Sequence, residues 1–208
     1  IEQRLKDEAG TYGLVIKNLK TQETYFYNEN QQFTTASLYK LWVMAVAFEQ
    51  INQGNLREND SVSLSRGQIE EIQGFWEEGI DQDAYYSVSD AIEQMIVVSD
   101  NDSAITLYTH MGEDKIDEFL KRHNFASSGF GSPPITNPKD IADYLEKLYK
   151  GTIVNREYSN KMLELLFNQR LNDRLPKYLP EKTRVAHKTG ELDSFKHDVG
   201  IVELEGGD

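Results

Sequence analysis

The segment Thr34–Ile51, with the sequence TTASLYKLWVMAVAFEQI, constrains the architecture more than any other part of the chain. After a short polar entry, its apolar residues recur at helical spacing around more than half of the circumference, which predicts a helix over Leu38–Gln53. Gly54 then provides a common C-terminal stop. A helix that is apolar on most sides is buried, so we expect the other elements to pack around it.

Short strands and further helices are expected on both sides of this segment. Residues 10–19 and 23–27 are two β-like runs joined by Lys20-Thr21-Gln22, which predicts an opening hairpin. We interpret Arg66–Tyr86 as an acidic surface stretch. The other predicted strands are Ser61–Leu64, Thr183–His187 and His197–Glu205. The other predicted helices are one from Ser87 to Val98, then Ser103–Met111, Lys115–His123, Pro138–Tyr149 and about Tyr158–Gln169.

The order of the predicted elements is strands, then many helices, then strands again. Such segregation is typical of an α+β protein with a largely antiparallel sheet, and not of alternating βαβ units. We expect a single domain over residues 1–208. Its helical lobe, about residues 61–179, would pack on a sheet lobe in which about residues 1–60 and 180–208 share one sheet.

Composition excludes several classes of protein and site. The 22 basic and 35 acidic residues give a net charge of −13, so we expect no nucleic-acid partner. The longest apolar run, Leu41–Phe48, is far shorter than the roughly 20 residues that a membrane span needs. The chain has no cysteine and its four histidines lack metal-binding spacing, so neither a metal site nor a cofactor is expected. An acidic cluster is most simply solvated surface, although weak calcium binding or a basic partner also fits it. It consists of Glu70, Glu71, Glu77, Glu78, Asp81 and Asp83.

The two ends of the chain have the pattern of a piece of a longer protein. The chain begins Ile1-Glu2-Gln3 without an initiator methionine or a signal-peptide pattern, so we interpret it as a mature or excised fragment. At the other end, Glu205-Gly206-Gly207-Asp208 is typical of a hairpin turn, but no returning strand follows. We therefore expect the domain to be truncated at its C-terminus.

Ser37 and Lys40 place a hydroxyl and an amine three residues apart at the start of the most apolar helix. Residues at this spacing share a helical face, so we expect Lys40 to reach Ser37 directly. Burial lowers the proton affinity of an amine, which makes a lysine a usable base for a serine hydroxyl. The helix N-terminus adds N–H groups where an oxyanion would form. In the plainer alternative, Ser37 only caps the helix and Lys40 is a surface residue.

Two further polar tripeptides follow along the chain. Ser99-Asp100-Asn101 closes a predicted helix, where a hydroxyl and an amide can relay a proton and bind an amide carbonyl. Lys188-Thr189-Gly190 ends a predicted strand and offers a cation and a hydroxyl to a carboxylate, with a glycine that allows close approach. The first also fits an ordinary helix-capping junction, and the second a Lys-Thr pair before a turn glycine. The three motifs together, in this order, favour a catalytic site.

These three motifs resemble those of class A β-lactamases and penicillin-binding proteins. The sequence around the motifs also resembles that family over nearly the whole chain. Examples are VVSDNDSAITLY at residues 97–108, ITNPKDIADYLEKLYKG at 135–151 and AHKTGELDSFKHDVGIV at 186–202. The resemblance implies a helical lobe packed against a five-stranded antiparallel sheet flanked by helices, with the active site between them. The last strands and the C-terminal helix of that fold would be missing after Asp208.

The resemblance also implies a role for each matching residue. Ser37 would be the acylated nucleophile, Lys40 its activating base, and Ser99 the group that carries a proton to the leaving nitrogen.

On the substrate-binding side, the resemblance implies that Asn101 holds the substrate amide. Lys188 and Thr189, followed by Gly190, would bind the substrate carboxylate. The backbone N–H groups of Glu191 and of the nucleophile itself would form the oxyanion hole.

One departure from the family concerns turnover. Class A β-lactamases have a loop with Glu-x-x-Leu-Asn, whose Glu activates the deacylating water. Residues 102–135 contain no such motif, and residues 124–135, NFASSGFGSPPI, contain no carboxylate. We therefore expect an active-site serine hydrolase, similar to class A β-lactamases, that forms an acyl-enzyme on Ser37 with β-lactams or related peptidoglycan amides. The missing Glu favours slow hydrolysis of this ester, a pattern that belongs to the alternative of a slowly deacylating, DD-peptidase-like protein. This alternative also covers a non-catalytic penicillin-binding or sensor protein that keeps the cleft.

The implied partner is a small-molecule β-lactam or a peptidoglycan stem peptide. The implied location is outside the cytoplasmic membrane, with the protein secreted or anchored through a segment absent from this sequence. We expect a monomer.

Overall fold

The computed structural model describes Leu5, residues 8–74 and residues 82–204. The hairpin turn expected at residues 205–208 lies outside the described residues, and so do Glu77, Glu78 and Asp81 of the acidic cluster.

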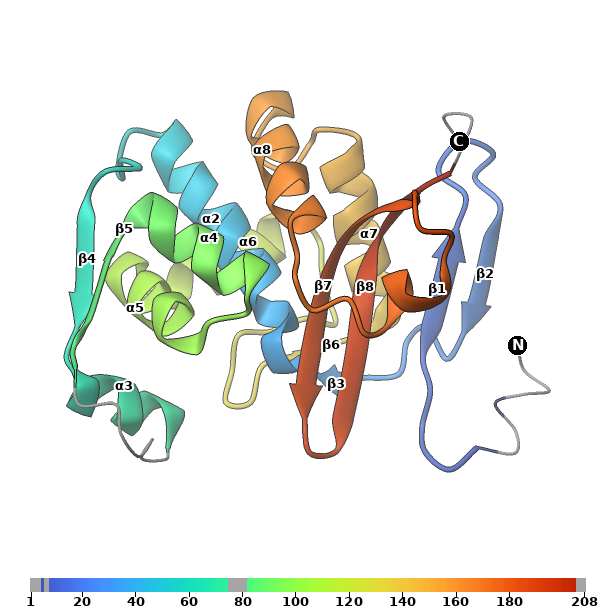
Figure 1. The fold of residues 1–208 in the computed structure, drawn as a ribbon, viewed down its shortest axis with the longest axis horizontal. Helices are drawn as coiled ribbons and strands as arrows, with labels where there is room; N and C mark the ends of the chain where they lie inside the picture. The colour runs from blue at the N-terminus through green and yellow to red at the C-terminus, as the bar shows by residue number, and fades with distance from the viewer. Residues whose placement is uncertain (1–4, 6–7, 75–81, 205–208) are drawn as a thin grey trace.

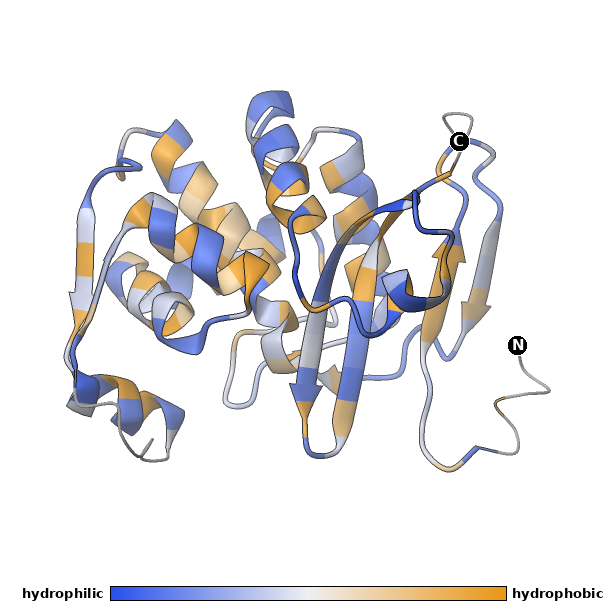
Figure 2. Cartoon of the chain, in the orientation of Figure 1, coloured by the Kyte–Doolittle hydropathy of each residue, from blue (hydrophilic) through white to orange (hydrophobic). Residues whose placement is uncertain are grey.

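The predicted central helix is the core of the molecule. It begins as a 3₁₀ turn, η1 (Ala36–Tyr39), and continues directly as α2 (Lys40–Asn52). Every residue from Lys40 to Phe48 is buried, so the middle of this helix has no solvent-facing side, as its sequence predicts. Figure 2 shows α2 coloured mainly from white to orange along its middle, whereas the outer end of α8 is blue.

The other helices surround α2 or connect it to the strands. They are α3 (Arg66–Gln73), α4 (Val88–Val97), α5 (Asn101–Met111), α6 (Asp114–Arg122), α7 (Pro138–Tyr149), α8 (Arg156–Phe167) and the 3₁₀ turn η2 (Leu175–Tyr178). Polar side chains cap the first turns of several of them, as is usual for helix N-termini. The capping residues are Ser65, Ser87, Asp100, Asn137 and Asn155. Figure 1 shows α2, α4, α5 and α6 grouped on one side of the molecule.

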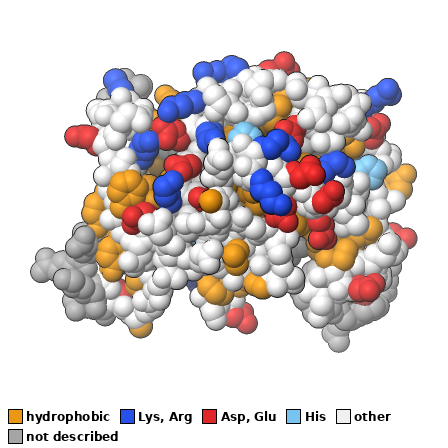
Figure 3. Space-filling view, turned by 180° about the vertical axis from the view of Figure 1, so that it is seen from behind, with side chains coloured by type: hydrophobic (Ala, Val, Ile, Leu, Met, Phe, Trp, Pro, Cys, Tyr) orange, Lys and Arg blue, Asp and Glu red, His pale blue; other side chains and the backbone are white. Residues whose placement is uncertain are grey.

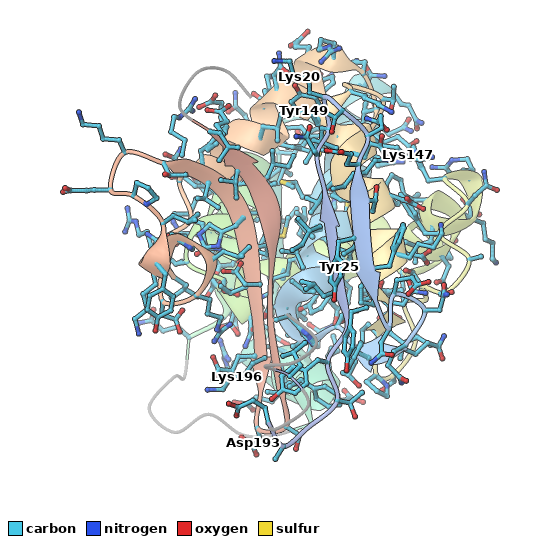
Figure 4. The ribbon with its side chains drawn as sticks, turned by 90° about the vertical axis from the view of Figure 1, so that its right-hand side faces the viewer. Lys20, Tyr25, Lys147, Tyr149, Asp193 and Lys196 are labelled. Atoms are coloured by element: carbon cyan, nitrogen blue, oxygen red, sulfur yellow. The ribbon has the colours of Figure 1, made fainter. Side chains whose placement is uncertain are left out.

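All the described strands pair in an antiparallel manner, which confirms the α+β class. The pairs are β1 (Leu14–Lys17) with β2 (Thr24–Tyr27), β3 (Phe33–Thr34) with β6 (Ile135–Thr136), β4 (Ser61–Leu64) with β5 (Ala84–Ser87), and β7 (Arg184–Leu192) with β8 (Phe195–Glu203). The prediction that the first and last thirds of the chain share one sheet is wrong for the described residues, because their hairpins form separate ladders. Both β1 and β8 pack against α7, and Figures 1 and 4 show the two hairpins side by side.

The interpretation of Arg66–Tyr86 as an acidic surface stretch is incomplete, because most of its described residues are exposed but the stretch also forms regular elements with a buried side. The described part of this stretch forms α3 and β5, and Arg66, Ile69 and Glu70 are buried. Arg66 is buried because its guanidinium forms an ion pair with Asp102 at the start of α5. A buried ion pair between segments far apart in sequence leaves no local hydrophobic pattern.

The hairpin β7–β8 crosses directly over η1. A Cβ placed on Gly190 would lie 2.9 Å from the carbonyl oxygen of Thr35 and 3.3 Å from Cβ of Ala36. Only a glycine therefore allows β7 to approach the start of the central helix this closely. The Lys188-Thr189-Gly190 motif, expected at the end of a strand, instead lies within β7, which continues to Leu192.

Acidic and basic side chains are interspersed over the face shown in Figure 3, so the negative net charge does not form a single patch there. Among the described residues, no helix is both long and apolar enough to cross a membrane.

Candidate active site

Ser37 lies in the first turn of the central helix, below β7. The residue before it, Ala36, has a φ of +45°, which is uncommon for a residue with a Cβ. This left-handed backbone turns the chain from β3 into η1 just before the serine. Strained backbone of this kind is concentrated at functional sites, where the surrounding contacts enforce it.

Lys40 is fully buried one turn after Ser37. Its Nζ donates to the carbonyl oxygen of Ser99 (2.5 Å), to Asn101 Oδ1 (2.8 Å) and, at longer range, to Ser99 Oγ (3.4 Å). The expected direct hydrogen bond to Ser37 is not formed among the described residues, because an ammonium has three donors and these partners use all three. Burial lowers the pKa of Lys40 to about 7, against the opposing charge of Asp100.

The second motif forms the tight connection between α4 and α5. Ser99 has a φ of +61°, and Asp100 accepts a hydrogen bond from the backbone N–H of Ser103 at 2.7 Å. The hydroxyl of Tyr86 donates to the same carboxylate oxygen at 3.3 Å. The side chain of Asp100 is therefore a helix cap, and it leaves Ser99 and Asn101 to face Lys40.

Lys188 brings a second buried amine to the same point. Its Nζ donates to Ser99 Oγ (2.8 Å) and to the carbonyl oxygen of Thr189 (2.9 Å). Burial and, to a smaller extent, the positive charge of Lys40 lower the pKa of Lys188 to about 7. The hydroxyl of Ser99 thus contacts both amines.

A pocket of about 330 Å³ opens at this junction. It is lined by Ser37, Ser99, Asn101, Leu171, Asp173, Arg174, Thr189 and Glu191. The structure therefore brings all three sequence motifs to one place, with Lys40 and Lys188 buried behind Ser99 and with Gly190 against the turn that carries Ser37.

Sequence reasoning missed three of the lining residues: Leu171, Asp173 and Arg174. They lie between α8 and η2, in a segment without a motif. Arg174 is held by Nη1, which donates to the carbonyl oxygens of His197 (3.0 Å) and Gly190 (3.4 Å). The sequence offered only one weak signal, an arginine among polar residues shortly before a predicted strand.

His187 is buried on β7 and is held on both sides of its ring. Nδ1 lies 2.8 Å from Asp198 Oδ1, and Nε2 lies 2.9 Å from Asn172 Oδ1. Asp198 also accepts from the backbone N–H of Leu175 at 2.8 Å. These contacts fasten the segment that carries Arg174 to the β7–β8 hairpin.

The segment between α6 and α7 is of a different chemical character. Phe130 packs edge-on against the rings of Tyr39 (5.7 Å between centroids) and Tyr108 (5.1 Å). Two carboxylates outside the segment anchor its backbone: Asp117 accepts from the N–H of Phe130, and Asp140 accepts from the N–H of Ser127. The segment itself, residues 124–135, has no acidic residue.

Within the described residues, no group of three or more His, Asp or Glu side chains is arranged to hold a metal ion.

The chain was compared with known protein families, curated proteins and solved structures. The model of the β-lactamase enzyme family (Beta-lactamase2) matches residues 1–208. β-Lactamase BRO-1 of Moraxella catarrhalis is 22% identical over 187 residues, covering 83% of this chain and 60% of the relative. β-Lactamase VEB-1 of Pseudomonas aeruginosa is 24% identical over 235 residues, covering 100% of this chain and 77% of the relative. The chain thus spans about three fifths of the length of BRO-1.

Solved structures share the fold. PBP-A superimposes with a TM-score of 0.88 at 21% identity, over 99% of this chain and 81% of that one. A mutant of PBP-A, solved as an acyl-enzyme complex with penicillin G, gives a TM-score of 0.85 at 21% identity, over 94% and 76% of the two chains. The β-lactamase of Sphaerobacter thermophilus gives 0.83 at 21% identity, over 94% and 78%.

Proposed function

This chain belongs to the β-lactamase enzyme family, and we propose that it is an active-site serine hydrolase that forms an acyl-enzyme on Ser37 with β-lactams or related peptidoglycan amides. One observation carries the proposal. Two buried lysine amines converge on the hydroxyl of Ser99, at 3.4 and 2.8 Å, beside a pocket that Ser37 lines. Two amines with pKa values near 7 can hold or release a proton at neutral pH.

In the proposed acylation, Lys40 is neutral, so it keeps only two N–H donors and can turn its lone pair toward Ser37. Ser37 Oγ attacks the carbonyl carbon of the amide and its proton passes to this amine. Collapse of the tetrahedral intermediate breaks the C–N bond, and Ser99 donates its hydroxyl proton to the leaving nitrogen. Ser99 then regains a proton from Lys40, so the amine returns to its neutral form. The hydrogen bond from Lys188 occupies a lone pair of Ser99, which leaves its own O–H free to donate.

The remaining residues would bind and polarise the substrate. Asn101 would hold the substrate amide, and Lys188 and Thr189 its carboxylate. The N–H groups of Ser37 and Glu191 would stabilise the oxyanion, since the close contact at Gly190 keeps the two backbone segments together.

We further propose that Arg174 contributes to anion binding. Its guanidinium lines the pocket on the side where Thr189 and Glu191 lie. A guanidinium matches the two oxygens of a carboxylate better than a lysine ammonium does.

A second candidate function is a penicillin-binding or sensor protein that is acylated but deacylates slowly, as a DD-peptidase does with β-lactams. The aromatic and hydroxyl character of residues 124–135, where no carboxylate is available to activate water, favours it. The acyl-enzyme form of the PBP-A mutant provides a precedent in a protein of the same fold.

We propose that the chain acts as a monomer and as one domain over residues 1–208, on a small-molecule β-lactam or a stem peptide outside the cytoplasmic membrane. Family membership supports the substrate class, and a pocket of about 330 Å³ suits a small molecule.

A time course of intact mass after a pulse of penicillin G tests both candidates. We expect one ligand equivalent on the protein, absent from Ser37→Ala, with loss of the adduct taking many minutes. Rapid loss, together with fast hydrolysis of a chromogenic cephalosporin, would exclude the slow-turnover candidate. The absence of any adduct, together with no hydrolysis of either compound, would exclude both.

A further inference from the structure

The carboxylate of Glu191 stands inside the pocket, directly after the Lys188-Thr189-Gly190 motif. Its side chain is half exposed, and one oxygen accepts a hydrogen bond from Arg174 Nη2. The other oxygen lies 3.2 Å from Lys196 Nζ, on the opposite side of the β7–β8 turn. Figure 4 shows Lys196 near this end of the hairpin, with Asp193 at the turn.

Arg174 has little freedom to leave this carboxylate. Nη1 is fixed on backbone carbonyls of both strands of the hairpin, and Nε lies 3.5 Å from Asp173. The remaining nitrogen, Nη2, is the one that Glu191 occupies. The guanidinium therefore enters the pocket already paired with a carboxylate of this chain.

The charges divide the pocket into two parts. Its inner end has the buried amines of Lys40 and Lys188 behind Ser99. Its outer lining has two carboxylates, Asp173 and Glu191, and the guanidinium of Arg174, and Lys196 pairs with Glu191 from the neighbouring strand. The hydrogen bond from Lys196 and the charge of Arg174 keep the pKa of Glu191 below its ordinary value, so the carboxylate is ionised at neutral pH.

We propose that Glu191 is a specificity-determining residue, which competes with the carboxylate of the substrate for Arg174. This inference rests on the proposed function and adds to it a substrate class. An anionic acyl donor must displace Glu191 before it can use the guanidinium. An acyl donor that is neutral or bears an ammonium near the cleaved bond meets no such competitor, and an ammonium gains the attraction of the carboxylate.

Three ligands that share one acyl group test this competition: penicillin G, its methyl ester and its diethylaminoethyl ester. The second-order rate constant of acylation is measured for each by intact mass, in the wild type and in Glu191→Gln. The glutamine keeps the backbone N–H and the size of the side chain but removes the charge. We expect the acid-to-methyl-ester ratio to rise about three- to tenfold, and the ammonium-to-methyl-ester ratio to fall by about threefold.

Glu203→Gln is the matched control. Glu203 pairs with Arg184 at the other end of the same hairpin, at 2.8 Å and with similar exposure, so this variant changes the net charge equally but away from the pocket. Its two ratios should stay within about 1.5-fold of the wild type. The gain in Glu191→Gln should also shrink between 50 and 500 mM salt, since the charges of the outer lining are solvated.

Other outcomes overturn specific parts of the argument. If the acid-to-ester ratio is unchanged or falls in Glu191→Gln, Glu191 does not compete for Arg174. If Glu203→Gln gives the same rise, only the overall charge matters, and the inference is wrong. If the wild type neither forms an adduct with any of the three ligands nor hydrolyses them, the proposed function fails instead.

Discussion

The two sides of Ser37 differ sharply in their chemistry. On one side, the start of α2, the α4–α5 junction and β7 bring together two amines, a hydroxyl and an amide that are joined by hydrogen bonds. On the other, the segment between α6 and α7 presents the ring of Phe130 to Tyr39 and Tyr108. The first side, here called the acylation side, has the groups needed to form an ester on a serine. The second, the loop side, supplies no acidic residue of its own between 124 and 135 to activate water.

This contrast teaches that the two halves of a serine hydrolase reaction need different residues, and that one half can be complete without the other. Acylation needs a nucleophile, a base and a proton donor, and Ser37, Lys40 and Ser99 are the residues proposed for these roles. Deacylation of a hindered ester needs an activated water in addition. Each prediction below changes one of the two sides.

Removal of the nucleophile should have the largest effect. Ser37→Ala should lower the rate of acylation by penicillin G by at least about 10³-fold, because Ser37 is the proposed acceptor of the acyl group. Labelling with a fluorescent penicillin, followed by measurement of the intact mass of the protein, gives the rate of acylation. Ser61→Ala, an exposed serine on β4, is the control and should label normally. Persistent labelling of Ser37→Ala at another serine would place the nucleophile elsewhere.

Removal of the proposed base should have the next largest effect. Lys40→Met keeps the length and apolar stem of the side chain, and we expect a loss of about 10²- to 10⁴-fold in acylation. In the wild type the rate should rise with pH through about 7, because only the neutral amine accepts a proton and burial lowers the pKa of Lys40 to that value. A rate that is flat from pH 5.5 to 8.5 would contradict this role.

The same burial makes stability depend on pH. The folded state holds Lys40 with a pKa near 7, whereas the unfolded chain keeps its proton up to about 10.4, so the unfolded state binds more protons in between. The free energy of unfolding of the wild type, relative to Lys40→Met, should therefore rise by about 2 kcal/mol from pH 7 to pH 9. Urea unfolding at several pH values measures this difference. A fall over the same range would mean that the amine is stabilised in its charged form.

The approach of β7 to the nucleophile turn should be the next most sensitive feature. In Gly190→Ala the new Cβ would lie 2.9 Å from the carbonyl oxygen of Thr35, so strand and turn must move apart. We expect acylation to slow by about tenfold as the two backbone N–H groups of the proposed oxyanion hole separate. Gly67→Ala, a helical glycine with open space around it, is the control and should keep the wild-type rate. An unchanged rate in Gly190→Ala would show that this close approach is not needed.

The sequence predicted elements best where the signals are local. Pro138–Tyr149 was predicted with the bounds that the structure gives, because Asn137 caps the helix and its apolar residues repeat at helical spacing. Ser61–Leu64 was predicted equally well from its extended pattern.

Features set by contacts across the chain were missed. The burial of Arg66 depends on Asp102, and the position of Arg174 depends on carbonyl oxygens of β7 and β8. The prediction of one sheet shared by the two ends of the chain is wrong for the same reason. An alternating pattern predicts that a strand exists but not which other strand it pairs with. The predicted hydrogen bond between Ser37 and Lys40 is not formed. The spacing of these two residues carries no information on Ser99 and Asn101, which bind the amine instead.

The smallest effect on acylation is expected on the loop side, where a substitution should lower the stability of the fold without slowing the reaction. Asp140 is buried and accepts hydrogen bonds from the N–H of Ser127 (2.8 Å) and the hydroxyl of Ser128 (2.9 Å). Asp140→Ala should lower the free energy of unfolding by about 1–3 kcal/mol, because two part-buried donors lose their acceptor.

The same variant should acylate within about threefold of the wild type if the loop side takes no part in that step, since changes at sites without shared partners act independently. Asp143→Ala, an exposed residue of the same helix paired with Lys139, is the control and should change stability by less than about 0.5 kcal/mol. A tenfold loss of acylation in Asp140→Ala, in protein shown by circular dichroism to be folded, would mean that the loop side also shapes the acylation step. The two sides of Ser37 would then be coupled through the contact between Phe130 and Tyr39, at the base of the nucleophile helix.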